Sequence, residues 1–157
     1  MADRYLPVLL EYRESVNPEP GVAQAPSLAE QRRAIGRLVT TWGGELGDDA
    51  VIARGGDEPL MIDIGDEIRG VVMFSLQALQ RGPAIDVGLA QSIWSQVDVL
   101  SFLVEDLHAR DAQSFADLLD MMLTITAVVR RDVSPEWRNL VLSGAHSGPH
   151  DPAGTKR

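Results

Sequence analysis

Glu105 and His108 form the Glu-x-x-His pair of the sequence, which is the spacing that metal-binding helical bundles use. A dinuclear carboxylate site takes such a pair from each of two helices and a further Glu from each of two others. The other histidines, His146 and His150, lie in the polar C-terminal segment, so one chain lacks the second pair. We therefore interpret the pair as a helix-end histidine beside a solvated glutamate, and we predict neither a metal nor a cofactor. A site assembled in a symmetric dimer is the alternative, although it still needs extra Glu ligands.

Two pairs of aspartates are also spaced three residues apart, Asp63 with Asp66 and Asp117 with Asp120. They resemble the acidic pairs with which helical nucleotide pyrophosphohydrolases hold Mg²⁺ between facing helices. The Glu-containing motif of that family is absent, and Asp66 suits a helix N-cap. The resemblance implies a metal-dependent carboxylate hydrolase, which is the alternative function. No residue is assigned as catalytic or as a metal ligand.

The sequence excludes several other kinds of functional site and gives only weak evidence for an anion site. The sequence has no cysteine, which excludes disulfides and thiolate sites, and no glycine-rich phosphate-binding motif. Arg32, Arg33 and Arg37 cluster on one predicted helix. We interpret this cluster as a solvated helix face, with an anion site as the alternative.

Composition narrows the class of protein. The chain has 157 residues, of which 45% are hydrophobic, which suits one globular domain with its own core. Its formal net charge is −9, and this charge repels the phosphates of nucleic acids and of anionic membranes. No apolar run approaches the ~20 residues of a membrane span, and the N-terminal segment lacks the pattern of a secretory signal. We expect a cytoplasmic protein with neither a nucleic-acid nor a membrane partner.

Start and stop signals divide most of the chain into predicted helices. The clearest is the capping box of Ser27 and Glu30, which begins a helix that Gly43 and Gly44 end. The other predicted helices span residues 3–16, 66–81, 86–109, 111–131 and 134–144. Residues 50–63 form either a small β-hairpin or an irregular loop. The short links favour antiparallel neighbours, so the predicted fold is mainly α, a bundle of about five to six helices in one domain over 1–144. Residues 145–157 form a disordered tail.

Two of these predicted helices, over 66–81 and 86–109, are apolar on every side. Leu100 and Leu118 belong to the stripes through which the helices 86–109 and 111–131 are expected to pack together. A second set of apolar side chains lies off the stripes and needs another cover, which is either the N-terminal helices or a second chain. This set is Val99, Phe102, Leu103, Met73 and Phe74. We expect it to be a partner-binding surface.

The leading functional hypothesis is therefore a non-enzymatic helical module for protein–protein interaction, such as an accessory subunit, an adaptor or a small regulatory protein. Its expected partner is a second copy of the chain, in a homo-oligomer, or another protein. The sequence does not identify that partner, a substrate or a pathway.

Overall fold

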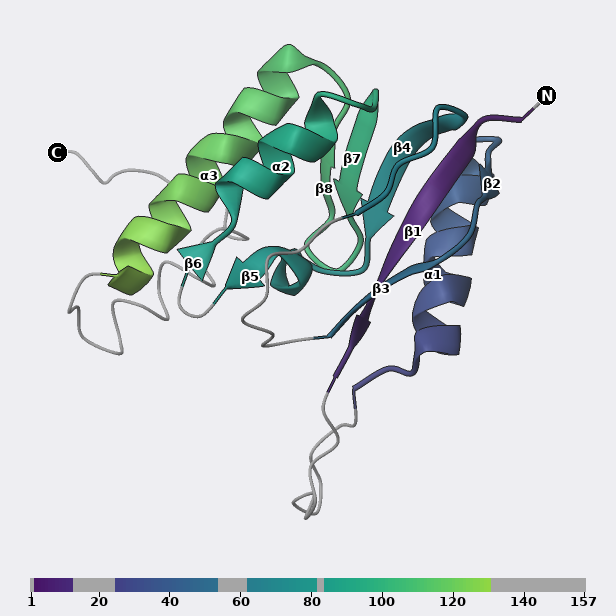
Figure 1. Ribbon diagram of the computed structural model, residues 1–157, viewed down its shortest axis with the longest axis horizontal. Helices are drawn as coiled ribbons and strands as arrows, with labels where there is room; N and C mark the ends of the chain where they lie inside the picture. The colour runs from purple at the N-terminus through teal and green to yellow at the C-terminus, as the bar shows by residue number, and fades with distance from the viewer. Residues whose placement is uncertain (1, 13–24, 54–61, 82–83, 131–157) are drawn as a thin grey trace, which may run out of the picture.

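The computed structural model describes residues 2–12, 25–53, 62–81 and 84–130, which form an α/β fold with a mixed sheet between helices (Figure 1). The predicted antiparallel helical bundle is therefore wrong. The strands are β1 (Arg4–Glu11), β2 (Glu45–Leu46), β3 (Ala50–Ala53), β4 (Ile68–Met73), β5 (Gln80–Arg81), β6 (Ala84–Ile85), β7 (Val99–Phe102) and β8 (Leu107–Ala109). The helices are α1 (Leu28–Thr41), the short 3-10 helix η1 (Leu76–Leu79), α2 (Val87–Trp94) and α3 (Ala112–Arg130).

The main sheet has the strand order β2-β1-β4-β7-β8, and β3 pairs with β1 beyond the end of β2. All of its pairings are parallel except the last, since β8 returns antiparallel to β7. β5 and β6 form a separate antiparallel pair. Helix α1 covers one face of the main sheet, called here the α1 face, and helices α2 and α3 cover the other, the α2/α3 face (Figure 1).

Alternate residues of the inner strands supply the cores on the two faces, as the pleat of a β-strand requires. The core of the α1 face contains Tyr5, Leu9, Ile35, Val39, Val72, Phe74 and Val99. The core of the α2/α3 face includes Leu6, Val8, Leu10, Val71, Met73, Leu100, Phe102, Ala90, Ile93, Phe115, Leu118 and Met122. The inner strands are therefore mostly apolar on both sides because both of their faces are covered.

This double burial explains why three predicted helices are wrong. Residues 3–16 contain β1, residues 66–81 contain β4, η1 and β5, and residues 86–109 contain α2, β7 and β8. A short run that is apolar on all sides fits a buried helix and a parallel strand equally well by periodicity alone. The run around Val71 and the run around Leu100 are only four to six residues long as strands, which is the length that favours a strand.

The helices with clear boundary signals are confirmed. The Ser27 hydroxyl accepts a hydrogen bond from the Glu30 backbone N–H at 3.1 Å and caps α1. The helix ends before Gly43, which has a φ of 75°, a conformation that glycine adopts without steric cost. Helix α3 corresponds closely to the predicted helix over 111–131. None of the helices in the described ranges is long and apolar enough to cross a membrane.

The segment 50–63 is only partly described. Residues Ala50–Ala53 form β3, which pairs in parallel with β1, and residues 62–65 have no regular structure. The expected helix over 134–144, the expected tail over 145–157 and the two histidines in that tail lie outside the described residues.

Pro7 lies inside β1, although proline is rare in the middle of a sheet because it has no N–H to donate. Its position explains the exception. β2 pairs with Arg4 and Tyr5, and β3 pairs with Val8 onward, so Pro7 lies opposite the break between these two partner strands. The missing donor therefore falls where the ladder on this side of β1 is already interrupted.

Candidate functional site

Open parallel sheets bind ligands beyond the carboxyl ends of their strands, where neighbouring strands connect in opposite directions. In this sheet that point lies between β1 and β4. The chain leaves β1 through α1 on one face, and it leaves β4 through α2 on the other face before it enters β7. A polar side chain of this chain lies at each of these two strand ends.

Gln31 of α1 occupies the end of β1. Its side-chain oxygen accepts a hydrogen bond from the Leu10 N–H at 2.8 Å, and its Nε2 donates to the Leu10 carbonyl at 2.7 Å. Nε2 also donates to the Pro26 carbonyl at 3.1 Å. Gln31 is fully buried, so its amide substitutes for the strand partner that Leu10 lacks on the β4 side, where the register with β4 ends at Val8. The residue holds α1 on the sheet and is not free to bind a ligand.

Glu105 occupies the end of β4. Its carboxylate accepts hydrogen bonds from the Ser75 hydroxyl at 2.8 Å and from the Leu76 N–H at 2.9 Å, at the start of η1. Glu105 lies in the turn between β7 and β8, and not on a helix as expected. Because the carboxylate bonds two donors at the end of the neighbouring strand, its role in the described structure is to tie the β7–β8 turn to β4.

His108 lies on β8, across the strand pair from Ser101 of β7. Its Nδ1 is 3.0 Å from the Ser101 Oγ, and its Nε2 is 2.8 Å from an Asp106 carboxylate oxygen. These are the residue types of a hydrolytic triad. However, Ser101 has 0% of its surface exposed, so no substrate carbonyl can reach its hydroxyl. The cluster orders the β7–β8 hairpin and does not form a nucleophilic site.

Trp42, which follows α1, joins this hairpin to the rest of the α1 face. Its ring is 5.3 Å from the ring of Tyr5 and meets the His108 ring edge-on at 6.0 Å. The Arg110 guanidinium lies over the Trp42 ring, 4.7 Å from its centre. Such cation–π and edge-to-face contacts stabilise packing. His108 is thus held by an aromatic ring and two hydrogen-bond partners, which explains its position without a metal.

The five residues expected to meet a partner do not form one surface. Phe102 and Met73 lie in the core of the α2/α3 face, and Val99 and Phe74 lie in the core of the α1 face. The exposed fraction of each of these four side chains is 9% or less, and Leu103 is half-buried against the α1 face. This chain itself covers them. Leu100 and Leu118 do share one core, as expected, but Leu100 reaches it from a strand.

The two aspartate pairs are not brought together. Asp63 and Asp66 precede β4, whereas Asp117 and Asp120 are exposed on α3. Asp117 accepts a hydrogen bond from the Gln113 side chain at 3.0 Å. Within the described ranges, no three His, Asp or Glu side chains are grouped so that they could hold a metal ion. The described geometry therefore gives no support to the hydrolase alternative.

An acidic hollow of about 330 Å³ lies beside the amino ends of β4 and β7. Its acidic lining residues are Asp3, Asp66, Glu67 and Asp98. Arg69 also lines it and forms an ion pair with Asp3 at 3.4 Å. This partial neutralisation, together with the exposure of all four carboxylates, makes the hollow an ordinary solvated surface.

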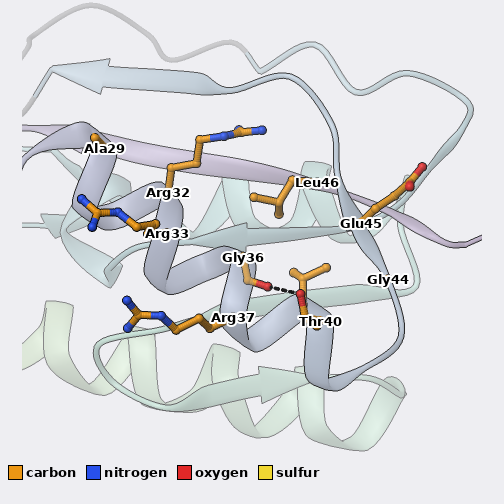
Figure 2. A pocket seen from close by; sticks show the side chains of 10 residues that line it. Ala29, Arg32, Arg33, Gly36, Arg37, Thr40, Gly44, Glu45 and Leu46 are labelled. Carbon is orange, nitrogen blue, oxygen red and sulfur yellow. Dashed lines mark hydrogen bonds between the residues drawn. The ribbon is translucent and has the colours of Figure 1, made fainter.

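A groove of about 850 Å³ lies on the outer side of α1, between this helix and the segment that contains β2. Figure 2 shows that Arg33 and Arg37 extend from α1 in the same direction, whereas Arg32 extends elsewhere. The other residues that line the groove are Ala29, Gly36, Val39, Thr40, Gly44, Glu45 and Leu46. The arginine cluster is evident in the sequence. The other wall of the groove, formed by the segment that contains β2, is not evident there, because this segment is separated from α1 by a turn.

Comparisons with protein-family models, with curated proteins and with solved structures find no match. A functional assignment for this chain therefore rests on the geometry of its described residues. Among these, the arginine-lined groove combines an open hollow with charged side chains that are not used inside the fold.

Proposed function

We propose that this chain is a non-enzymatic protein–protein interaction module that binds its partner through the outer side of α1. The observation that carries the proposal is the groove of about 850 Å³ whose rim bears the exposed side chains of Arg33 and Arg37. Exposed arginines are enriched at protein interfaces, where the guanidinium can form several hydrogen bonds at once. This proposal moves the expected interaction surface from the buried strand residues to α1.

The state of the chemically capable side chains supports a binding role over a catalytic one. Gln31, Glu105 and His108 are each engaged in hydrogen bonds within the chain. A catalytic acid, base or nucleophile has to reach a bound substrate. The groove, in contrast, offers cations and apolar surface, which favour recognition.

Site-specific photo-crosslinking in the native host tests this proposal. A photoreactive amino acid at Thr40, which lines the groove, is expected to form a discrete adduct with one protein. The same amino acid at Ser92, which is exposed on α2 across the sheet, is the matched control and is expected to form none. The adduct's mass distinguishes a second copy of the chain from another protein, and the captured protein must also bind the purified chain. Equal adducts at both positions, or none at Thr40, would contradict the proposal.

A further inference from the structure

We infer that the groove on α1 binds an acidic peptide segment of the partner, with two carboxylates held by Arg33 and Arg37. This inference rests on the proposed interaction function and adds the chemistry of the partner. The segment is expected to lie along the helix, over the part of the groove that Gly36 and Leu46 line.

The first argument is the charge of the two arginines. They are four residues apart on α1, so they are neighbours on one side of the helix, where like charges repel and destabilise the helix. Neither guanidinium lies within 4.0 Å of a carboxylate in the described ranges, where the ion pairs formed by arginine are those of Arg4, Arg32 and Arg69. A carboxylate-bearing ligand would remove this repulsion, so the pair is complementary to an acidic segment.

Arg32 shows the contrasting case on the same helix. Its guanidinium forms an ion pair with Asp49 and donates to the Gly47 carbonyl at 3.4 Å, so it holds the β2–β3 connection against α1. Arg32 thus builds the wall of the groove and is excluded from the proposed ligand set. Arg32 therefore has a structural role, whereas Arg33 and Arg37, on the same helix, have the proposed binding role.

The spacing of the arginines limits the shape of the acidic segment. Side chains four residues apart on a helix have Cβ atoms about 5–6 Å apart. In an extended peptide, side chains on the same face are two residues apart and separated by about 6.6 Å. An acid-x-acid sequence in an extended segment therefore places one carboxylate against each guanidinium. Gly36, on the turn between Arg33 and Arg37, lies against Leu46, whose Cδ1 is 3.4 Å from where a Cβ would stand, so these two residues form the floor over which the peptide is expected to lie.

The groove suits a peptide better than it suits a nucleic acid. The chain carries a net charge of −9, and Glu45 lines the groove itself. A phosphate backbone, with a charge at every nucleotide, is repelled by such a surface, whereas a short segment with two carboxylates meets mainly the two arginines. The apolar lining from Ala29, Val39 and Leu46 also matches the uncharged positions of a peptide.

The test uses the full chain and a fluorescently labelled peptide of alternating Glu and Ala, with binding followed by anisotropy. The Glu-Ala peptide is expected to bind, and a Gln-Ala peptide of the same length is not. Arg33→Gln with Arg37→Gln is expected to weaken binding about tenfold, from two ionic contacts of up to about fivefold each. Raising the salt concentration is expected to weaken binding as well, because exposed charges are screened.

The control variant is Gln91→Glu on α2 with Gln96→Glu in the turn that follows it, which changes the net charge by the same two units across the sheet. Both glutamines are exposed, and this variant is expected to bind within about twofold of the parent chain. Arg33→Lys with Arg37→Lys, which keeps the charge, is expected to retain most of the binding. Circular dichroism checks that each variant is folded.

Several outcomes would overturn the inference. These are equal binding of the Gln-Ala peptide, an equal loss of binding in the α2 control, and displacement of the peptide by inorganic phosphate or by a single-stranded oligonucleotide at equal charge concentration. A partner that crosslinks at Thr40 regardless of the Arg33→Gln, Arg37→Gln change would overturn the acidic-segment inference alone. The absence of any crosslink at Thr40 would overturn the proposed interaction function.

Discussion

The two faces of the sheet differ in how they are covered and in what their helices offer to solvent. The α2/α3 face has the larger core, to which two helices contribute large apolar side chains, and Trp94 of α2 stacks on Phe115 of α3 at 4.7 Å. The α1 face has a smaller core under one helix. It includes the buried amide of Gln31 and the hydrogen-bonded cluster around His108.

The two faces therefore have different roles: the α2/α3 face mainly stabilises the fold, and the helix of the α1 face presents charged side chains to solvent. Burial of apolar surface is the dominant favourable term in folding, so the larger core of the α2/α3 face is expected to contribute more of the stability. Helix α1 is fixed by specific hydrogen bonds at its start and by aromatic contacts at its end. Its outer side is then free to carry unpaired arginines, because few of the contacts that hold it depend on that side.

The largest effect is expected from Phe102→Asp, on the α2/α3 face. Phe102 has 0% of its surface exposed, so the substitution buries a charge without a partner and removes an aromatic ring. We expect a cost of about 4 kcal/mol or more and loss of the cooperative melt, followed by circular dichroism. If the variant stays folded and instead loses a bound partner, Phe102 belongs to an interface and the two-face description fails.

Cavity-forming substitutions compare the two cores directly. Leu100→Ala on the α2/α3 face and Ile35→Ala on the α1 face each empty a fully buried position, with an expected cost of about 2–5 kcal/mol. We expect Leu100→Ala to cost more, because two helices packed on each other hold the cavity open while the single helix can settle toward the sheet. Denaturant melts measure both values, and the opposite order would reverse the comparison.

Gln31→Met tests whether α1 depends on its hydrogen bonds. The substitution keeps the approximate size of the side chain but leaves the Leu10 N–H and carbonyl without a partner. Each orphaned buried group is expected to cost about 1–3 kcal/mol, and amide exchange at Leu10 is expected to accelerate. Glu30→Gln, on the exposed neighbour, serves as the control. An unchanged free energy of unfolding in Gln31→Met would show that packing alone holds the helix.

The cap of α3 gives a pH-dependent effect on the α2/α3 face. The Ser114 backbone N–H donates to the Asp111 carboxylate at 2.8 Å, and the Ser114 hydroxyl also donates to it, so the pKa of Asp111 is lowered from its ordinary value of 3.8. The stabilisation is present above 3.8 and is lost as the pH falls through the lower pKa of the folded state. The difference in Tm between the parent chain and Asp111→Ala is therefore expected to be constant near neutral pH and to shrink below 3.8. A difference that grows in acid would contradict this cap.

The smallest effect is expected on the outer side of α1. Arg33→Gln with Arg37→Gln removes a like-charge pair, so we expect a gain in stability of about 0.2–0.5 kcal/mol in denaturant melts at low salt. A loss of more than about 1 kcal/mol, which exceeds the usual effect of surface substitutions, would show that these arginines stabilise the fold. They would then no longer be spare charges for a partner.

The parts of the fold that the sequence predicts well are those with boundary chemistry. Ser27 and Gly43 mark the two ends of α1, and the long stripe that includes Phe115 and Leu118 marks α3. The strands lack such signals, and the side chains of the inner strands are mostly apolar on both faces. Val99 and Phe102 are apolar off the expected stripe because they belong to a strand buried on both faces, and Leu103 follows in the turn, half-buried against the α1 face.

The candidate site is predicted from the sequence only in part. Arg32, Arg33 and Arg37 are evident as a cluster, and their helix was correctly placed. Which of them is engaged depends on Asp49, which reaches Arg32 through the β2–β3 connection. The hydrogen bonds of Gln31 with Leu10 likewise join residues that are 21 positions apart. Contacts of this kind depend on how the strands pair, and local periodicity does not report strand pairing.

The position of β1 has a consequence for how the chain folds during its synthesis. β1 is made before its partners on both sides, which lie between Glu45 and Met73, and the sheet then extends to β7. A parallel sheet of such distant pairs forms more slowly than a helical bundle of equal length, because the long loops must close before their contacts stabilise the structure. Until β2 and β3 emerge from the ribosome, the apolar β1 has open edges on both sides, and the edge that pairs with β4 stays open longer. Open edges of this kind are the situation in which nascent chains aggregate or recruit chaperones.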